Sequence, residues 1–227
     1  MRQLFGGQYP DLVMFDLDGT LVDSVPDLAC AIDKMLLALG LPEAGVDKVI
    51  GWVGKGAAAL VRRALLDASH ASHAAMVDES LFEQAYALFL RFYGEATADQ
   101  SQLYPGALEC LEGLVEQDIK LGLVTNKPID FTHSMLTGFG LERFFSVVLG
   151  GDSLAKKKPD PLPLLDAMRR CDVTAENSLM VGDSINDVSA ARAAGCPVVC
   201  VPYGYNHGEA ISLAKPDLIV DRLDLLL

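Results

Sequence analysis

The sequence predicts an α/β fold, in which helices flank a parallel sheet and one helical insertion interrupts the chain. Three observations support this prediction. The segment 12–15, Leu-Val-Met-Phe, is uniformly apolar, which is typical of a strand buried on both faces of a parallel sheet. From residue 104 onward, short apolar segments alternate with helical patterns, which indicates parallel strands joined by right-handed crossovers. Between these two regions, residues 24–100 contain only helical patterns.

The insertion is expected to begin with a helix directly after the first strand. Ser24 is the predicted N-cap of this helix, and Pro26 suits its first turn. Apolar residues recur at helical spacing over 28–39, and Gly40 ends the pattern. Further helices are predicted over 44–50, from 57 to about 66, and from about 76 to 96.

The second half of the chain alternates between helices and strands. Strands are predicted at 119–124, 147–149, 178–181, 198–201 and 217–220. Helices are predicted at 105–115, 129–140, 162–171 and 185–195. This order is typical of a Rossmann-like sheet. We therefore expect residues 1–23 and 101–227 to form an α/β core domain and residues 24–100 to form an inserted helical cap domain.

The composition is that of a globular protein with an acidic surface. Hydrophobic residues make up 51% of the chain and charged residues 22%, so a packed core is expected. The formal net charge of −13 repels nucleic acid, and no nucleic-acid partner is expected. A small anionic substrate is compatible with this charge only where its pocket supplies positive charge locally.

The cysteines and the apolar segments indicate a cytoplasmic protein without a membrane partner. The five cysteines are odd in number and form no Cys-x-x-Cys pair, which favours free thiols in a reducing compartment. No apolar run approaches the roughly 18 residues of a membrane helix, and no apolar signal segment is expected at the N-terminus. The sequence leaves open whether the protein is a monomer or a homodimer.

Two carboxylates follow the first predicted strand. Asp16 and Asp18 lie within the sequence Asp-Leu-Asp-Gly-Thr, and the carboxyl ends of parallel strands are where ligands bind in open α/β sheets. Crowded carboxylates repel each other, so we expect a bound cation or a shared proton. The alternative is an acidic strand end followed by an ordinary loop. The close acid pair, the glycine and the hydroxyl together favour a functional site.

Other polar side chains follow the later strands of the predicted sheet. They are Thr125, Asn126, Lys158, Asp183 and Asp187. Each has an ordinary alternative, because a Thr-Asn pair also caps helices, acids also favour a helix N-terminus, and a lysine triplet is usually a surface run. We keep the surface interpretation for Lys156 and Lys157. The combination of these groups along one sheet favours a shared site.

These residues, in this order, resemble the four motifs of the haloacid dehalogenase superfamily of phosphohydrolases. The segment 16–20 resembles the first motif, Thr125 the second, Lys158 the third, and Gly182-Asp183 with Asp187 the fourth. The resemblance covers the whole chain, including the helical cap. It implies a magnesium-dependent phosphomonoester hydrolase.

The resemblance also implies the roles of the two leading aspartates. Asp16 would attack phosphorus and form an aspartyl-phosphate, while Asp18 would act first as an acid and then as a base. In the superfamily, the dehalogenase branch lacks an aspartate at the position of Asp18, and mutases commonly have an apolar residue at the position of Thr20. Both comparisons favour hydrolysis of phosphate esters.

The remaining motif residues are implied to bind the metal and the phosphoryl group. Mg²⁺ would be held by Asp16, the backbone carbonyl of Asp18, and Asp183, with Asp187 supporting these ligands. The phosphoryl oxygens would be held by Thr125, the backbone amide of Asn126, and Lys158.

The cap is expected to determine which substrate is accepted. The loop 51–56, Gly-Trp-Val-Gly-Lys-Gly, is predicted to reach the site. Lys55 and Arg63, and also Arg62, are candidate partners for a substrate carboxylate, and ordinary surface charges are the alternative.

Four segments are similar to those of phosphatases that convert 2-phosphoglycolate to glycolate: 50–54, 124–128, 150–152 and 203–206. This similarity implies a small phosphorylated carboxylate as the substrate. Two alternatives remain open. One is a sugar-phosphate phosphatase or phosphomutase of the same superfamily. The other is a non-catalytic binding module, against which the presence of both Asp16 and Asp18 argues.

Overall fold

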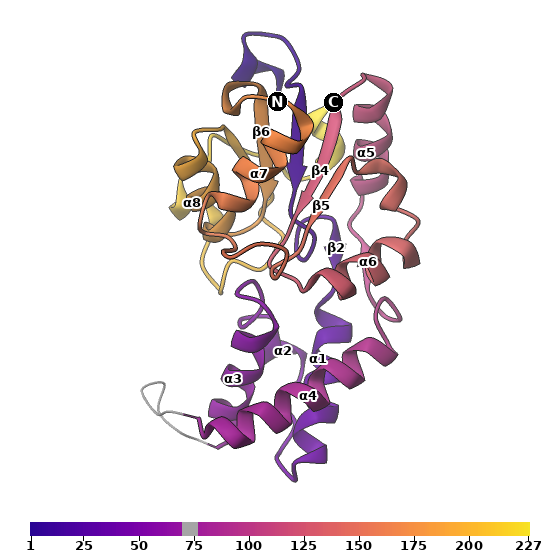
Figure 1. Ribbon diagram of the computed structural model, residues 1–227, viewed down its shortest axis with the longest axis vertical. Coiled ribbons are helices and arrows are strands. Elements are labelled where there is room, and N and C mark those ends of the chain that lie inside the picture. The colour runs from indigo at the N-terminus through magenta and orange to yellow at the C-terminus, as the bar shows by residue number, and fades with distance from the viewer. Residues whose placement is uncertain (70–76) are drawn as a thin grey trace.

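The centre of the fold is a six-stranded parallel sheet, which the computed structural model places above a group of helices (Figure 1). The structure describes residues 1–69 and 77–227. The order of the strands in the sheet is β5-β4-β1-β6-β7-β8. They are β1 (Leu12–Phe15), β4 (Lys120–Val124), β5 (Val147–Leu149), β6 (Ser178–Gly182), β7 (Val198–Cys200) and β8 (Leu218–Ile219).

Strand β1 lies in the middle of the sheet and is buried on both faces. Val13 and Phe15 pack with the helices α5 (Ala107–Glu116) and α6 (Ile129–Gly138). Leu12 and Met14 point to the opposite face, where α7 (Leu162–Cys171) and α8 (Ile185–Ala194) lie. Burial on both faces explains why all four residues of this strand are apolar, as the sequence predicts.

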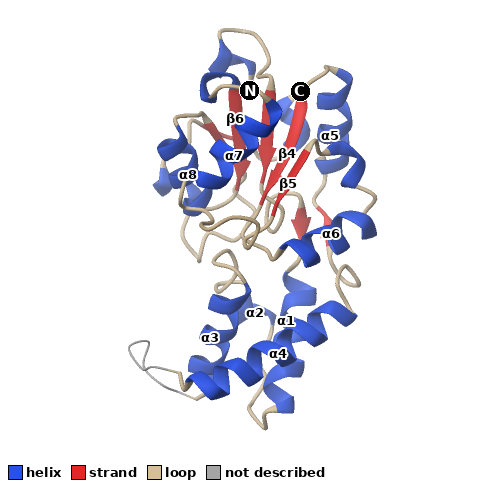
Figure 2. Cartoon of the chain, in the orientation of Figure 1, coloured by secondary structure: helices blue, strands red, loops and turns tan. Residues whose placement is uncertain are grey.

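The helices of the insertion form a separate hydrophobic cluster below the sheet (Figure 2). They are α1 (Val25–Ala38), α2 (Val46–Val49), α3 (Ala57–Ala68) and α4 (Glu79–Glu95). We call this group the cap. The start that the sequence predicts for α4, at residue 76, lies outside the described residues. Within them, Asp78 caps this helix by accepting a hydrogen bond from the Leu81 amide at 3.0 Å.

The prediction that Ser24 caps α1 is only half right. Ser24 occupies the N-cap position, but its hydroxyl makes no capping hydrogen bond within the described part of the chain. Its backbone N–H instead donates to the Tyr205 hydroxyl at 3.0 Å. The α1 N-terminus is therefore tied to a loop of the core, which the local sequence does not indicate.

Two short strands connect the core with the cap, and the sequence does not predict them. β2 (Val22–Asp23) and β3 (Gln102–Leu103) pair antiparallel, with Asp23 opposite Gln102. Two-residue strands are too short to produce a recognisable pattern. The chain enters and leaves the cap at this pair, so we keep residues 1–23 and 101–227 as the proposed core domain and 24–100 as the proposed cap domain.

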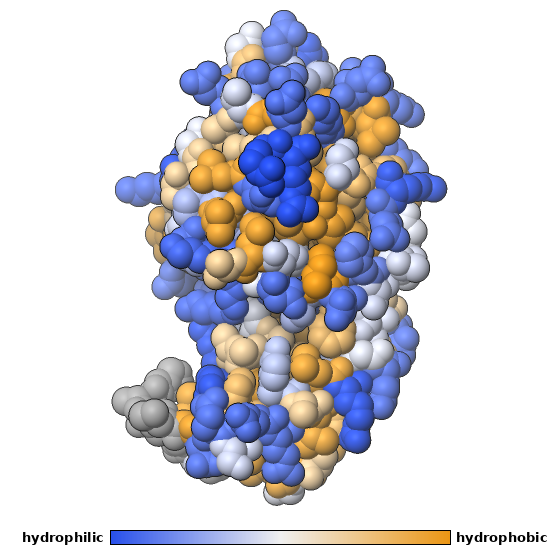
Figure 3. Space-filling model, in the orientation of Figure 1, coloured by the Kyte–Doolittle hydropathy of each residue, from blue (hydrophilic) through white to orange (hydrophobic). Residues whose placement is uncertain are grey.

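The surface carries mixed polar and apolar residues. On the face drawn in Figure 3, hydrophilic residues predominate at the top and sides, and hydrophobic residues are visible around α7, where Leu162 and Leu165 are exposed. All five cysteines are free, and four of them are buried. Among the described residues, no helix combines the length and the apolar character needed to cross a membrane.

Candidate active site

The loops that follow β1, β4 and β6 bring most of the predicted site residues together at the carboxyl edge of the sheet. Strand pairing places Phe15 beside Leu123 and Val181, so the residues that follow these three strands are neighbours. A cavity opens at this edge toward the cap. Its lining includes Asp16, Asp18 and Thr125. The predicted convergence of the first two motifs is therefore present in the fold.

Asp16 is a buried carboxylate held by two donors. Its Oδ1 accepts a hydrogen bond from the Leu17 amide at 2.7 Å and lies 3.0 Å from the Lys158 ammonium. Burial raises the pKa of Asp16 to about 6, and the Lys158 charge opposes this shift. Both contacts engage the same oxygen. Within the described residues, neither of these contacts involves Oδ2.

Lys158 is a buried cation between the first and fourth motifs, as expected of a residue that gives an acidic protein local positive charge. Its side chain is 1% exposed, and its Nζ lies 2.6 Å from Asp187 Oδ1. Burial alone would lower the pKa of Lys158, but Asp16 and Asp187 raise it above the ordinary value. The side chain therefore remains an ammonium ion between two carboxylates.

Asp183 and Asp187 are fixed by the loop that leads into α8. The Asp187 carboxylate accepts from the Ser184 hydroxyl at 2.7 Å and from the Ser184 and Asp183 amides, which completes a capping box at the start of the helix. Asp183 accepts from the Thr20 hydroxyl at 2.8 Å and from the Tyr205 amide at 2.6 Å. Burial, together with the neighbouring charges of Asp187 and Asp16, raises the pKa of Asp183.

The acids at this edge fit a hard divalent cation. Carboxylate oxygens of Asp16, Asp183 and Asp187 all lie within 4.8 Å of one another. Such oxygens are the ligands that Mg²⁺ prefers. A cation would offset the burial and the mutual repulsion that raise the pKa values of Asp16 and Asp183. Asp187 already accepts bonds from Lys158 and from the loop amides, which suits the supporting role that we predict for it. The role of the Asp18 carbonyl stays a prediction.

Thr125 and Asn126 follow β4 and face two different neighbours. Thr125 is buried at the end of the strand, and its Oγ1 accepts a hydrogen bond from the Lys127 amide at 3.3 Å. The Asn126 side-chain amide donates to the Gly54 carbonyl at 3.0 Å and to the Lys158 carbonyl at 2.9 Å. Asn126 therefore joins the cap loop to the loop that carries Lys158, a role that its position in the sequence does not reveal.

The predicted cationic residues of the cap do not line the cavity. Arg63 donates to the carbonyls of Gly51 and Trp52, at 3.2 Å each, and so holds its own loop. Arg62 pairs with Glu79 on the surface. Lys55 is exposed. The prediction that the loop 51–56 reaches the site is nevertheless right, because Val53, Gly54 and Gly56 contribute to the lining.

Sequence reasoning missed three residues at or beside the site. Thr20 orients Asp183. Tyr205 binds Asp183 through its amide and Asp23 through its hydroxyl. Lys127 is buried against Asp18. All three lie inside the segments 16–20, 124–128 and 203–206, whose similarity to known phosphatases was a usable signal, but nothing in those segments indicates which neighbours the three side chains contact.

Comparisons with known proteins agree with this arrangement. The haloacid dehalogenase-like hydrolase family matches residues 13–201. The phosphoglycolate phosphatase of Pseudomonas putida is 51% identical over 226 residues, which cover 100% of this chain and 82% of that protein. The phosphoglycolate phosphatase of Nitrosococcus oceani is 45% identical over 214 residues, which cover 94% and 93% of the two chains.

A solved structure supports the same assignment. The crystal structure of a predicted phosphoglycolate phosphatase from Haemophilus somnus superposes with a TM-score of 0.90 at 41% identity, covering 95% of this chain and 96% of that one. The match extends over the sheet, the motif loops and the cap. With the family match and the geometry of the carboxyl edge, it shows that the chain belongs to the haloacid dehalogenase-like hydrolase family.

Proposed function

We propose that this protein is a magnesium-dependent phosphatase that hydrolyses 2-phosphoglycolate to glycolate and phosphate. The observation that carries the proposal is the buried Asp16 carboxylate, which lies 3.0 Å from the Lys158 ammonium and lines a cavity between sheet and cap. The substrate is inferred from relatives of that name, such as the Pseudomonas putida protein, which is 51% identical to this chain.

Asp16 is the proposed nucleophile. One of its oxygens attacks phosphorus, the bond from phosphorus to the ester oxygen breaks, and Asp18 gives a proton to the departing glycolate oxygen. Asp18 then takes a proton from water, and the resulting hydroxide attacks the aspartyl-phosphate. Phosphate leaves and the Asp16 carboxylate is restored.

The phosphoryl group is proposed to lie between Thr125, the Asn126 amide and Lys158. These donors are fixed by the fold before substrate arrives, which favours the charge that develops in the transition state. Asp16, Asp183 and the Asp18 carbonyl would hold Mg²⁺, supported by Asp187. When bound, the ion neutralises charge on the phosphoryl oxygens and the carboxylates.

The cap side of the cavity is proposed to exclude water during the reaction. Leu28, Leu60 and Phe89 contribute apolar surface to it. A dry site strengthens each electrostatic contact and limits water to the molecule that Asp18 activates. Movement of the cap would admit the substrate and release the product.

The test is release of phosphate by the purified protein from 2-phosphoglycolate and from a panel of sugar phosphates, with and without Mg²⁺. We expect a preference for 2-phosphoglycolate, loss of activity without metal, and a decrease of at least roughly 1,000-fold in Asp16→Asn. Asp11→Asn, the same change at the exposed opposite end of β1, serves as the matched control.

Three results would contradict the proposal. Phosphate release that persists in Asp16→Asn would remove Asp16 as the nucleophile. Faster turnover of sugar phosphates than of 2-phosphoglycolate would show that the substrate is a sugar phosphate. Interconversion of sugar phosphates without release of phosphate would indicate a mutase.

A further inference from the structure

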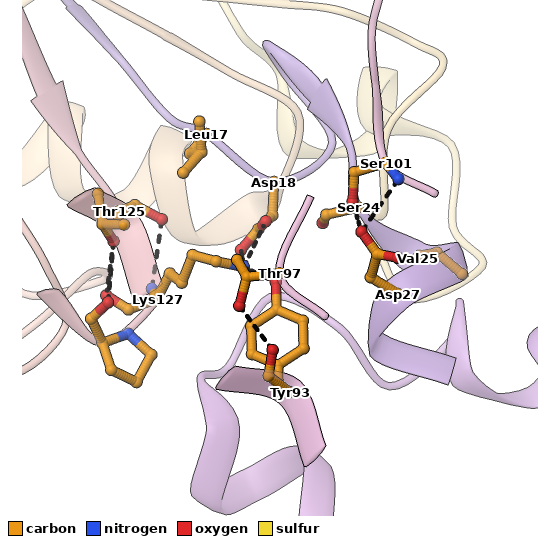
Figure 4. A network of polar contacts seen from close by, with 12 residues as sticks. Leu17, Asp18, Ser24, Val25, Asp27, Tyr93, Thr97, Ser101, Thr125 and Lys127 are labelled. Carbon is orange, nitrogen blue, oxygen red and sulfur yellow. Dashed lines mark hydrogen bonds and ion pairs between the residues drawn. The ribbon is translucent and has the colours of Figure 1, made fainter. Parts of the chain in front are cut away.

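The cavity contains a buried cation that the mechanism above does not use. Lys127 follows Thr125 and Asn126 after β4, and its side chain is 2% exposed. Figure 4 shows this side chain extending from the strand end toward Asp18, with the Tyr93 ring beside it. Burial of a charged lysine is costly unless paired and hydrogen-bonded groups offset the cost, so the contacts of this ammonium group indicate its role.

The ammonium group of Lys127 joins the core to the cap. Its Nζ lies 3.0 and 3.3 Å from the two carboxylate oxygens of Asp18. It also donates a hydrogen bond of 2.6 Å to the hydroxyl of Tyr93, which belongs to the cap helix α4. Burial would lower the pKa of Lys127, but Asp18 and Tyr93 raise it above its ordinary value, so the group remains charged.

The rest of the lining gives this charge particular weight. Among the described residues that line the cavity, Lys127 is the only cation, and the cap contributes mainly apolar side chains. Lys55, Arg62 and Arg63 are engaged elsewhere or exposed, as shown above. If the phosphoryl group of a substrate binds at Lys158, a second negative group on that substrate would find one buried cation, Lys127, among the described residues that line the cavity.

The geometry of the proposed substrate matches the position of Lys127. Asp18 has to lie within hydrogen-bond distance of the ester oxygen that it protonates. In 2-phosphoglycolate only one CH₂ group separates that oxygen from the carboxyl carbon, so the carboxylate oxygens lie about 3 Å from the ester oxygen. A carboxylate at this distance is within reach of the Lys127 ammonium, which contacts both oxygens of Asp18.

We propose that Lys127 binds the carboxylate of the substrate and thereby selects esters that carry a carboxylate one carbon from the ester oxygen. The Tyr93 hydroxyl accepts a hydrogen bond from Lys127, so its own proton is available for a second bond to the same carboxylate. The substrate would then be held by the core and by the cap together. This inference rests on the proposed function and names the residue that determines its specificity.

A purely positioning role for Lys127 predicts a different result. If Lys127 only orients Asp18, its loss slows every phosphate ester by a similar factor. If it binds the carboxylate, its loss reduces kcat/KM mainly for esters that carry one. Comparison of two substrates that differ only in this group therefore separates the two roles.

The experiment measures kcat and KM of wild type and Lys127→Met with two substrates, 2-phosphoglycolate and ethyl phosphate. Ethyl phosphate has a methyl group in place of the carboxylate. We expect the ratio of kcat/KM between the two esters to fall by roughly 10- to 100-fold, the range for loss of a charge-assisted hydrogen bond. Lys55→Met, the same change in the exposed cap loop, is expected to leave the ratio within about twofold.

Tyr93→Phe is the second variant, and it keeps the test valid if Lys127→Met does not fold. It removes one hydroxyl and no charge, so the same ratio is expected to fall by about 3- to 10-fold. Circular dichroism and thermal unfolding establish that each variant is folded before its kinetics are compared.

The outcomes separate the two proposals. An unchanged ratio in Lys127→Met or, if that variant is unfolded, in Tyr93→Phe overturns the role of Lys127, as does a ratio that falls in Lys55→Met instead. If wild type releases no phosphate from 2-phosphoglycolate, the proposed function itself fails. If wild type hydrolyses both esters equally well, hydrolysis stands but recognition of the carboxylate does not.

Discussion

At the scale of single residues, the site consists of two aspartates with different cationic neighbours. Asp16 lies against Lys158, and Asp18 lies against Lys127. The two residues are separated by one leucine in the sequence, yet their carboxylates belong to separate ion pairs. The two carboxylates therefore have separate surroundings, and the roles proposed for them differ: attack on phosphorus for Asp16 and proton transfer for Asp18.

Replacement of Asp18 by asparagine is expected to remove the proposed acid and base while keeping its size and its contact with Lys127. We expect kcat for 2-phosphoglycolate to fall by about 100- to 10,000-fold, the usual range for loss of a proton-transfer group. Steady-state release of phosphate measures this change. A loss below about tenfold would show that another group transfers the proton.

Thr20 is expected to act on metal binding through Asp183. Thr20→Val keeps the shape of the side chain but removes the hydrogen bond of 2.8 Å to the Asp183 carboxylate. Loss of such a supporting bond typically weakens metal affinity by about 10- to 100-fold. Activity measured against Mg²⁺ concentration, and the Mg²⁺-induced shift in melting temperature, report the change.

The matched control is Thr174→Val, which alters an exposed threonine whose side chain makes no capping bond. It is expected to leave both Mg²⁺ curves where they are in wild type. Equal curves for Thr20→Val and wild type would mean that the Asp183 carboxylate is held in place without this hydroxyl.

At the scale of elements, the two segments that connect core and cap are fastened by side chains. Asp27, in the first turn of α1, accepts a bond from the Gln100 amide at 2.8 Å. It also accepts one from the Ser101 amide at 3.0 Å (Figure 4). Tyr205 ties Asp23 and Ser24 to the loop that carries it. The antiparallel pair β2–β3 is therefore supported from both sides.

Loss of the Asp27 carboxylate is expected to destabilise the connection between core and cap. Asp27→Ala leaves the amides of residues 100 and 101 without their acceptor, at a cost of about 2–3 kcal/mol in the free energy of unfolding. Urea unfolding measures the difference. Asp221→Ala, at an exposed position, is the control and should change the free energy by less than about 0.5 kcal/mol.

The elements themselves follow from the sequence to within a few residues. The strand 147–149 and the helix 162–171 have the predicted ends, because apolar periodicity and flanking prolines or glycines define them locally. The pair β2–β3 was missed because its two-residue strands are joined by contacts between residues far apart in the chain.

The same distinction applies to the site. Motifs in the sequence allow one to predict that five side chains gather at the carboxyl edge of the sheet, while their roles stay predictions: Asp16, Asp18, Thr125, Lys158 and Asp183. The direction in which a cationic side chain points could not be predicted from the sequence. Lys127 points into the cavity while Arg63 turns back to its own loop, and only packing between core and cap decides between these orientations.

At the scale of the whole molecule, part of the negative charge of this acidic protein lies on buried carboxylates at the carboxyl edge of the sheet. The chain has a formal net charge of −13, and Asp16 and Asp183 add to the local repulsion at the carboxyl edge. The stability of the whole fold should therefore depend on protons and on divalent metal in a linked way.

Mg²⁺ is expected to stabilise the protein more at pH 8 than at pH 5. Burial raises the pKa of Asp16 to about 6 and also raises the pKa of Asp183. For Asp16, the folded state thus binds more protons than the unfolded state between about pH 4 and pH 6, so its stabilising contribution falls as pH rises through this window, and the raised pKa of Asp183 acts in the same direction. Mg²⁺ restores stability where the carboxyls are ionised, and protons compete with it increasingly as pH falls below about 6.

Thermal unfolding with and without Mg²⁺ at both pH values measures this linkage. The difference in melting temperature should be large at pH 8 and small at pH 5. The Asp183→Asn variant, which lacks one proposed ligand, should show a reduced difference at pH 8. Equal shifts at the two pH values in wild type would contradict the linkage.

The hydrogen bond from the Asn126 side chain to the Gly54 carbonyl should affect the rate at which the cap opens during turnover. Any motion that parts the helices from the sheet has to rupture this bond, and the one from Lys127 to Tyr93, because each spans the two halves of the molecule. The residues that follow β4 are thus proposed to bind the substrate, and the same segment also connects the core to the cap. Stronger contacts between core and cap would slow the release of glycolate. Weaker contacts would admit bulk water before the proposed aspartyl-phosphate is hydrolysed.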